Sequence, residues 1–155
     1  MKLSELININ GFIARNDKYG KMGKSKVVLV MMLVKFGKKT EEYTETQRSA
    51  FEKLKKDYEG FDEKVRKMQE YEAALNGKNE ELPWTEDEYR AFVNGDYKKV
   101  MEQLNEAMKP ELEKEVELDY KKFDADGFSE WMESNGIDAK SGAYLAQFLL
   151  DEKTL

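Results

Sequence analysis

The sequence predicts a mainly α-helical protein, in which a long antiparallel helical hairpin packs with further short helices and at most a small two-stranded β element. Apolar residues recur at steps of three and four from Phe36 to Leu75, which is the period of an amphipathic helix. Asn76-Gly77 is a strong helix stop. The 155 residues, of which 37% are charged and 40% hydrophobic, suit a single domain with a modest core and a polar surface.

The N-terminal part of the chain predicts a short helix, a loop and the start of a long helix. Ser4 can cap the short helix, and the loop covers residues 15–26. The long helix should begin near Ser25. The apolar run VVLVMMLV, at residues 27–34, is far shorter than the roughly 20 residues that span a bilayer, and we expect it to be buried on most sides.

The hairpin is expected at about residues 25–76, followed by a part with helices and one strand at about residues 84–151. Gly60 is expected to end the first helix of the hairpin, and Asp62 can cap the second. Because both helices carry a similar apolar stripe, we expect them to pack as an antiparallel pair. The alternative is one uninterrupted rod that passes through Gly60.

The C-terminal half is predicted to combine helices with one short strand. Thr85 and Glu88 have the spacing of a capping box at a helix start. Apolar and charged residues alternate over residues 116–123, as in a half-buried strand whose best partner is the apolar N-terminal stretch. Two short amphipathic helices, at about residues 127–134 and 139–151, should end the chain.

The composition excludes several kinds of chemistry. The chain contains no Cys and no His, so it has no disulfide framework, no thiolate metal site and no imidazole base. A hydrolase built on Ser-His or Cys-His is therefore excluded. We predict that the protein is not an enzyme and that it has no catalytic residue, no metal site and no cofactor.

Charge is distributed unevenly along the chain, whose net charge is −6. Residues 1–39 carry nine Lys or Arg and two Asp or Glu, a balance of +7. Residues 40–155 carry seventeen Lys or Arg and thirty Asp or Glu, a balance of −13. This asymmetry favours contact between the basic end and an acidic partner, or attraction between the basic and acidic parts of the chain.

Residues 122–133, KFDADGFSEWME, share several positions with a calcium-binding EF-hand loop. Asp124, Asp126 and Gly127 occupy its third, fifth and sixth positions. The first position, which should supply a carboxylate, is Lys122, and its ammonium group would repel the ion. We therefore interpret the segment as a turn and a helix N-cap, with Gly127 permitting the bend and the following aromatic residues facing the core.

Residues 20–26, GKMGKSK, end like a Walker A phosphate-binding loop and precede a helix. The first glycine of that motif would fall at position 18, which is a lysine, and no apolar strand precedes the loop. Nucleotide binding is therefore not expected. A contact with a partner protein or an anion is the better interpretation, and its candidate residues are Lys18, Lys21, Lys24 and Lys26.

Three stretches carry a family resemblance: LININGFI (6–13), a long charged helix that ends in FEKLKKDYE (51–59), and YKKVMEQLNEAMKPELEKEVELDYKKF (97–123). They resemble a family of small, uncharacterised tailed-phage proteins from siphoviruses and prophages, which have an N-terminal L-I-N-x-x-x-F element, a long helix and an E-V-E-L strand. The resemblance covers most of the chain. It implies a phage or prophage origin and assigns no role to any single residue.

These features together predict a non-enzymatic phage- or prophage-encoded protein that acts through protein–protein contacts, as a virion component or an assembly factor. Two alternatives remain open. One is an inhibitor of a host defence or nuclease protein that uses the acidic helical body, and the other is a weak anion- or nucleic-acid-binding module that uses the basic loop at residues 18–26. The expected partner is a phage structural protein, a host factor or a second copy of the chain, as in a homo-oligomer. Neither a membrane nor a nucleic acid is favoured, and the expected location is the host cytoplasm or the virion.

Overall fold

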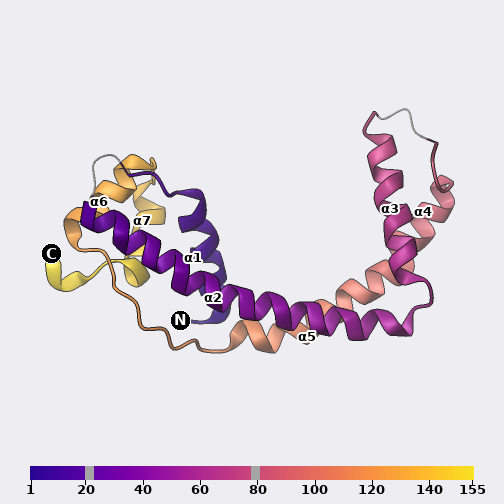
Figure 1. Ribbon diagram of the computed structural model, residues 1–155, viewed down its shortest axis with the longest axis horizontal. Coiled ribbons are helices and arrows are strands. Elements are labelled where there is room, and N and C mark those ends of the chain that lie inside the picture. Colours follow the sequence, from indigo (N-terminus) through magenta and orange to yellow (C-terminus); the bar gives the residue numbers. More distant parts are fainter. Residues whose placement is uncertain (20–22, 78–80) are drawn as a thin grey trace. The chain divides into compact units, whose positions relative to one another are not determined.

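The computed structural model describes residues 1–19, 23–77 and 81–155. Helices account for most of these residues, which confirms the mainly α fold (Figure 1). No regular β-strand occurs within the described ranges.

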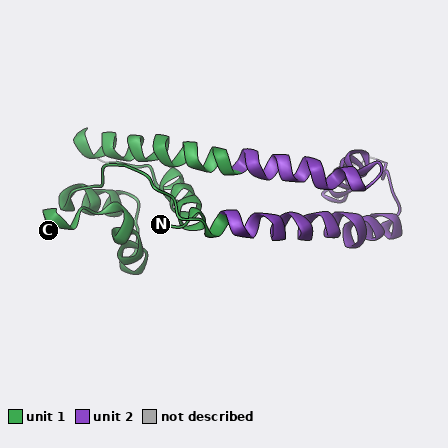
Figure 2. Ribbon diagram, turned by 90° about the horizontal axis from the view of Figure 1, so that it is seen from below, with its two compact units in different colours: residues 1–43, 112–155 green, residues 44–111 purple. Residues whose placement is uncertain are grey.

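The chain divides into two compact units (Figure 2). Unit 1 comprises Met1–Tyr43 and Leu112–Leu155, and unit 2 comprises Thr44–Glu111. Two long helices, α2 (Gly23–Leu54) and α5 (Lys98–Glu113), contribute residues to both units. Each unit has its own cluster of buried apolar residues.

Unit 1 contains α1 (Leu3–Arg15), the first part of α2, α6 (Ala125–Ser134), α7 (Ala139–Leu149) and a short 3₁₀ helix, η3 (Glu152–Thr154). The short N-terminal helix and the two C-terminal helices are therefore confirmed. The long helix begins two residues before the predicted start and continues without a break through the apolar run.

Charged residues occupy the N-cap positions of α1, α6 and α7 in unit 1. Asp124 and Asp138 cap α6 and α7, since each carboxylate accepts a backbone N–H three residues further on, at 2.7 Å in both cases. Lys2 is the N-cap of α1, and its backbone N–H donates to the Glu5 carboxylate at 2.7 Å. The prediction that Ser4 caps this helix was wrong, because the contact between Lys2 and Glu5 starts the helix earlier.

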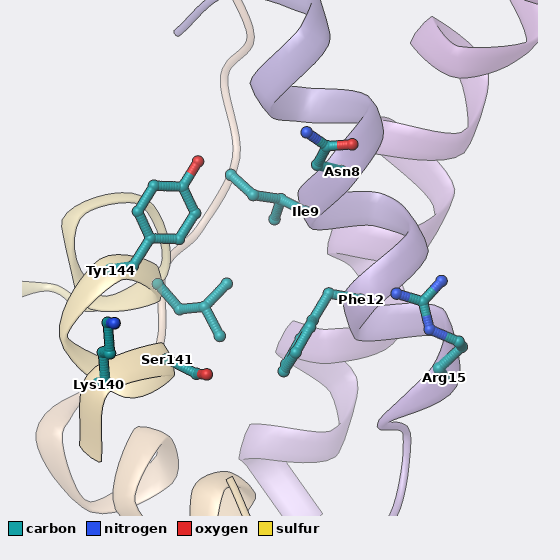
Figure 3. A pocket seen from close by; sticks show the side chains of 8 residues that line it. Asn8, Ile9, Phe12, Arg15, Lys140, Ser141 and Tyr144 are labelled. Atoms are coloured by element: carbon teal, nitrogen blue, oxygen red, sulfur yellow. The ribbon is translucent and has the colours of Figure 1, made fainter. Parts of the chain in front are cut away.

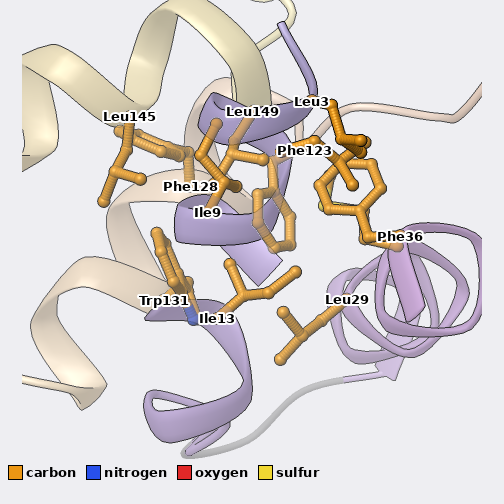
Figure 4. Packing of buried hydrophobic residues seen from close by; sticks show 12 residues of the cluster. Leu3, Ile9, Ile13, Leu29, Phe36, Phe123, Phe128, Trp131, Leu145 and Leu149 are labelled. Carbon is orange, nitrogen blue, oxygen red and sulfur yellow. The ribbon is translucent and has the colours of Figure 1, made fainter. Parts of the chain in front are cut away.

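The core of unit 1 lies among α1, α2, α6 and α7 (Figure 4). Trp131 is fully buried there, and its indole Nε1–H donates to the carbonyl oxygen of Asn16 at 2.6 Å. Its ring lies nearly parallel to that of Phe123, with centroids 5.7 Å apart. The aromatic residues of α6 therefore face the core, as predicted.

The segment at residues 116–123 shows the predicted alternation of partly buried and exposed residues, but it does not form a regular strand. The N-terminal stretch is its neighbour, as expected, through one antiparallel bridge between Lys2 and Glu115. The adjoining Val116 N–H donates to the carbonyl oxygen of Met1 at 2.9 Å. Pairing stops there because α1 begins at the next residue, and a helical backbone has no free edge to extend a β ladder.

Unit 2 contains the end of α2, a 3₁₀ turn (η1, Lys55–Asp57), α3 (Phe61–Leu75), α4 (Glu86–Phe92), a π-helical turn (η2, Val93–Tyr97) and most of α5. Gly60 has a φ of +66°, a left-handed conformation that glycine adopts without a steric penalty. The chain therefore breaks at Gly60, and the uninterrupted rod is excluded.

Within unit 2, α3 has different neighbours from those expected. It lies beside α4 (Figure 1) and packs mainly on α4 and η2. It meets the end of α2 through the rings of Phe51 and Phe61. Phe61 also contacts Phe92 and Tyr97, with centroids 5.7 and 6.4 Å away. This aromatic cluster fixes the start of α3 beside α4, so α3 does not pair along α2. Asp62 does not cap α3 but accepts from Lys55 at 3.0 Å.

Candidate functional site

The basic loop contains the predicted contact residues. Lys18, Lys24 and Lys26 are exposed, and Lys21 lies outside the described residues. The backbone of Lys18 is fixed to the end of α6, because its N–H donates to Asn135 Oδ1 at 3.0 Å and its carbonyl accepts from Asn135 Nδ2 at 2.8 Å. Its side chain faces solvent.

Lys24 and Lys26 lie in the first turn of α2. This first turn contains no acidic residue. Their charges add to the positive end of the helix dipole. This helix end therefore attracts anions in general.

The calcium-like segment forms the start of α6. The Asp124 carboxylate is used as the helix cap, and Asp126 is exposed in the first turn. Gly127 is helical, so the bend expected there was wrong. Its role is close packing, because a Cβ at this position would overlap the Ser25 hydroxyl of α2. In the part of the chain that the structure describes, no group of three or more acidic residues is placed to hold a metal ion.

The end of the Walker-like segment forms the start of α2. The Ser25 hydroxyl, which would face a phosphate or its metal ion in a true Walker A loop, lies against Gly127 of α6. Ser25 therefore contributes to the packing of two helices.

An exposed apolar stripe follows one face of α2. We define the α2 stripe as Val27, Val30, Met31 and Val34, whose exposed fractions are 61%, 48%, 46% and 47%. The opposite face of the same turns is buried in the core of unit 1 through Leu29, Met32 and Phe36. The expectation that the apolar run is buried on most sides was therefore wrong.

A lysine lies at each end of the α2 stripe. Lys24 precedes Val27 by three residues and Lys38 follows Val34 by four, so both lie on the same helix face. No Asp or Glu occurs from residue 23 to residue 40. The α2 stripe is thus an apolar surface in a positively charged setting.

A pocket of about 570 Å³ lies between α1 and α7 in unit 1 (Figure 3). We call it the α1–α7 pocket. Its apolar lining comes from Ile9, Phe12 and Leu145, with the ring of Tyr144 beside them. Its polar lining consists of Asn8, Arg15, Lys140 and Ser141. This site was not predicted from the sequence, because its two walls come from opposite ends of the chain and neither carries a recognisable motif.

The α1–α7 pocket has two cations and no acidic lining residue. Neither Arg15 nor Lys140 forms an ion pair with any of the described residues. Ser141 is engaged at the helix start, where its N–H and its hydroxyl both donate to Asp138. These two hydrogen bonds lower the pKa of the Asp138 carboxyl.

Two tyrosines of unit 1 are held by burial and backbone hydrogen bonds. The Tyr19 hydroxyl donates to the carbonyl of Gly127 at 3.3 Å, and the Tyr120 hydroxyl donates to the carbonyl of Phe148 at 2.7 Å. Burial raises the pKa of Tyr19 far above its ordinary value, and the negative charges of nearby carboxylates add to this. Burial also raises the pKa of Tyr120.

Comparison with protein-family models, with curated proteins and with solved structures found no match to this chain. Among the described helices, none combines the length and the apolar character needed to cross a membrane. The fold and its surfaces define a class: a small helical protein that exposes a lysine-flanked apolar stripe on one helix and a cationic pocket between two others.

Proposed function

We propose that the protein is a non-enzymatic phage- or prophage-encoded protein that acts through protein–protein contacts, as a virion component or an assembly factor. The α2 stripe is the observation that carries this proposal. Its four valine and methionine side chains are each about half exposed. A partner that covers them removes this apolar surface from water, which favours binding.

The spacing of the α2 stripe suits helix-in-groove or helix-to-helix docking. Its residues occupy positions i, i+3, i+4 and i+7, which form one face over two helical turns. The buried residues on the other side of α2 fix this face in orientation. A partner would therefore meet a preorganised surface, and little conformational entropy would be lost on binding.

The charges around the stripe indicate a partner with acidic and apolar side chains. Lys24 and Lys38 flank the stripe and Lys26 lies beside it, and no Asp or Glu occurs from residue 23 to residue 40, after which Glu41 and Glu42 follow. Two copies that met through this same face would bring lysines together, which is unfavourable. Charge complementarity therefore favours a different surface as the partner.

The acidic-body alternative receives less support. Many carboxylates of unit 2 form ion pairs with basic residues three or four positions away, as in the pairs Arg48–Glu45, Arg66–Glu70 and Arg90–Glu86. Such paired, alternating charges are typical of solvated helix surfaces and not of a nucleic-acid mimic. The anion-binding alternative depends on residues 18–26, whose described lysines belong to two places, Lys18 beside the end of α6 and Lys24 and Lys26 in the first turn of α2.

The test is incorporation of a Val30→Asp/Val34→Asp variant into phage particles. Both residues are exposed, so we expect the variant to keep the helical content and melting temperature of the wild type. Particles and assembly intermediates from cells that carry the phage are purified, and the protein is quantified by mass spectrometry. We expect the wild-type protein to co-purify and the variant to be depleted at least about tenfold, since two buried carboxylates in an apolar contact are costly.

Ser49→Asp is the control for added negative charge, because it places one carboxylate at an exposed position of α2 outside the stripe. It should co-purify like the wild type. Absence of the wild-type protein from both particles and intermediates would contradict the proposal, and so would retention of the double variant.

A further inference from the structure

The α1–α7 pocket has the size and the lining of a site for a small organic ligand. Its volume of about 570 Å³ lies in the usual range for such sites. Figure 3 shows Asn8, Ile9, Phe12 and Arg15 on α1, opposite Lys140, Ser141 and Tyr144 on α7. The site is separate from the α2 stripe, so this inference does not depend on the proposed function.

The charge of the pocket is unusual for this chain, whose net charge is −6. Each wall contributes one exposed cation, Arg15 from α1 and Lys140 from α7. Between residues 6 and 15 of α1, and along the whole of α7, no Asp or Glu is present. An anion that enters the pocket therefore meets two positive side chains and no acidic wall residue.

The side chain of Arg15 lies close to a glycine of the same helix. Its Nη1 atom lies 3.3 Å from the place where a Cβ on Gly11 would be, so the side chain folds back along α1 beside Gly11. A glycine inside a helix usually costs stability. Here the missing side chain leaves room for the guanidinium group.

The remaining lining is mainly apolar. Ile9 and Leu145 form part of the core, and Phe12 packs edge to face on Trp131 with centroids 6.2 Å apart. Tyr144, which also lines the pocket, is 44% exposed. A purely inorganic anion would leave these surfaces in contact with water, and a neutral apolar molecule would leave the two cations unused.

We propose that the α1–α7 pocket binds a small organic acid, whose carboxylate lies near Arg15 or Lys140 and whose alkyl or aryl body lies against Phe12 and Leu145. The guanidinium group can take the carboxylate in a two-point hydrogen bond, and the lysine adds a second positive charge. The apolar body removes Phe12 and Tyr144 from water.

The proposal is tested by titrating the full chain with octanoate, 1-octanol and acetate, followed by NMR of the methyl and aromatic groups. Octanoate should bind saturably and shift the resonances of Ile9, Phe12 and Leu145. 1-Octanol, which lacks the charge, and acetate, which lacks the body, should each bind at least about tenfold more weakly.

Two substitutions and a control identify the cations. Arg15→Gln and Lys140→Gln should each weaken octanoate binding about 3–10-fold, and the double variant should weaken it more. Lys99→Gln, which removes the same charge from an exposed position of unit 2, should leave binding unchanged. Both pocket cations are exposed, so these variants should melt like the wild type. The proposal would be overturned if octanoate and 1-octanol bound equally well, or if the double variant bound octanoate like the wild type. It would also be overturned if the shifts were confined to another part of the protein.

Discussion

Gly127 of α6 lies so close to Ser25 of α2 that a Cβ on the glycine would overlap the serine hydroxyl, and it would lie only 3.1 Å from the serine Cβ. The two residues belong to the two segments that resemble a calcium loop and a Walker A loop. Their similarity to ligand-binding motifs thus has a structural explanation: small residues occur where two helices of unit 1 approach each other.

Gly127→Ala should therefore destabilise the protein by about 1–3 kcal/mol, because the added methyl group forces α2 and α6 apart. The free energy of unfolding is measured by urea denaturation. Adding Ser25→Ala should recover part of the loss, since it removes the nearest atom. Gly37→Ala in α2 is the control: a Cβ there meets no atom within 4 Å, so it should stabilise the helix by about 0.5–1 kcal/mol. Equal effects of the two glycine substitutions would contradict this interpretation.

Asp124→Ala should cost about 1 kcal/mol, because it removes the carboxylate that accepts the Gly127 N–H at 2.7 Å. Asp124→Asn should keep most of the stability, since an amide oxygen can also cap a helix. Asp126→Ala, at an exposed position of the same turn, should change the free energy of unfolding by less than about 0.5 kcal/mol. A calcium-dependent rise in melting temperature that Asp124→Asn abolishes would instead show that the segment binds the ion.

Local patterns predicted most helices, and tertiary contacts decided the rest. The alternation over residues 116–123 correctly gave the buried and exposed side chains, but a strand also needs a partner of similar length. Leu3 already begins α1, so only one bridge to the N-terminal stretch forms among the described residues. In the same way, hydrophobicity alone could not show which face of residues 27–34 meets the core. The spacing shows that Val27, Val30 and Val34 lie on a different helix face from Leu29. Which of these two faces is buried follows only from the neighbours of α2.

The pocket could not be predicted for a different reason. Arg15 and Lys140 are far apart in the sequence, and each is a single exposed cation on an otherwise ordinary amphipathic helix. The fold brings them to one pocket through contacts between distant segments, such as the hydrogen bond from Trp131 to the carbonyl of Asn16. Short motifs signal a site only when one stretch of chain supplies most of its groups.

Phe61→Ala should cost about 3–5 kcal/mol, since this buried ring contacts four other aromatic rings in unit 2. The effect should appear as loss of the near-ultraviolet circular dichroism of the aromatic cluster, together with a lower melting temperature. Leu75→Ala, at the exposed end of the same helix, is the control and should change stability by less than about 0.5 kcal/mol. Similar effects at both positions would show that the aromatic cluster does not hold α3 in place.

The free energy of unfolding should fall as the pH rises above about 10, because the folded state disfavours the phenolate form of Tyr19 and Tyr120. Both tyrosines have a higher pKa in the folded protein than in the unfolded chain, so their contribution is complete below the unfolded value. It is lost as the unfolded chain releases protons at higher pH. Because both side chains are only partly buried, we expect each tyrosine to lower the free energy of unfolding by about 0.5–1 kcal/mol by pH 11.

Urea denaturation at pH 8, 9.5 and 11 measures this fall in the free energy of unfolding. The double variant Tyr19→Phe/Tyr120→Phe should be less stable at pH 8, because it has lost two hydrogen bonds. Its free energy of unfolding should fall less steeply as the pH rises. Lysine titration affects both proteins alike, so equally steep curves would rule out the tyrosines as the cause.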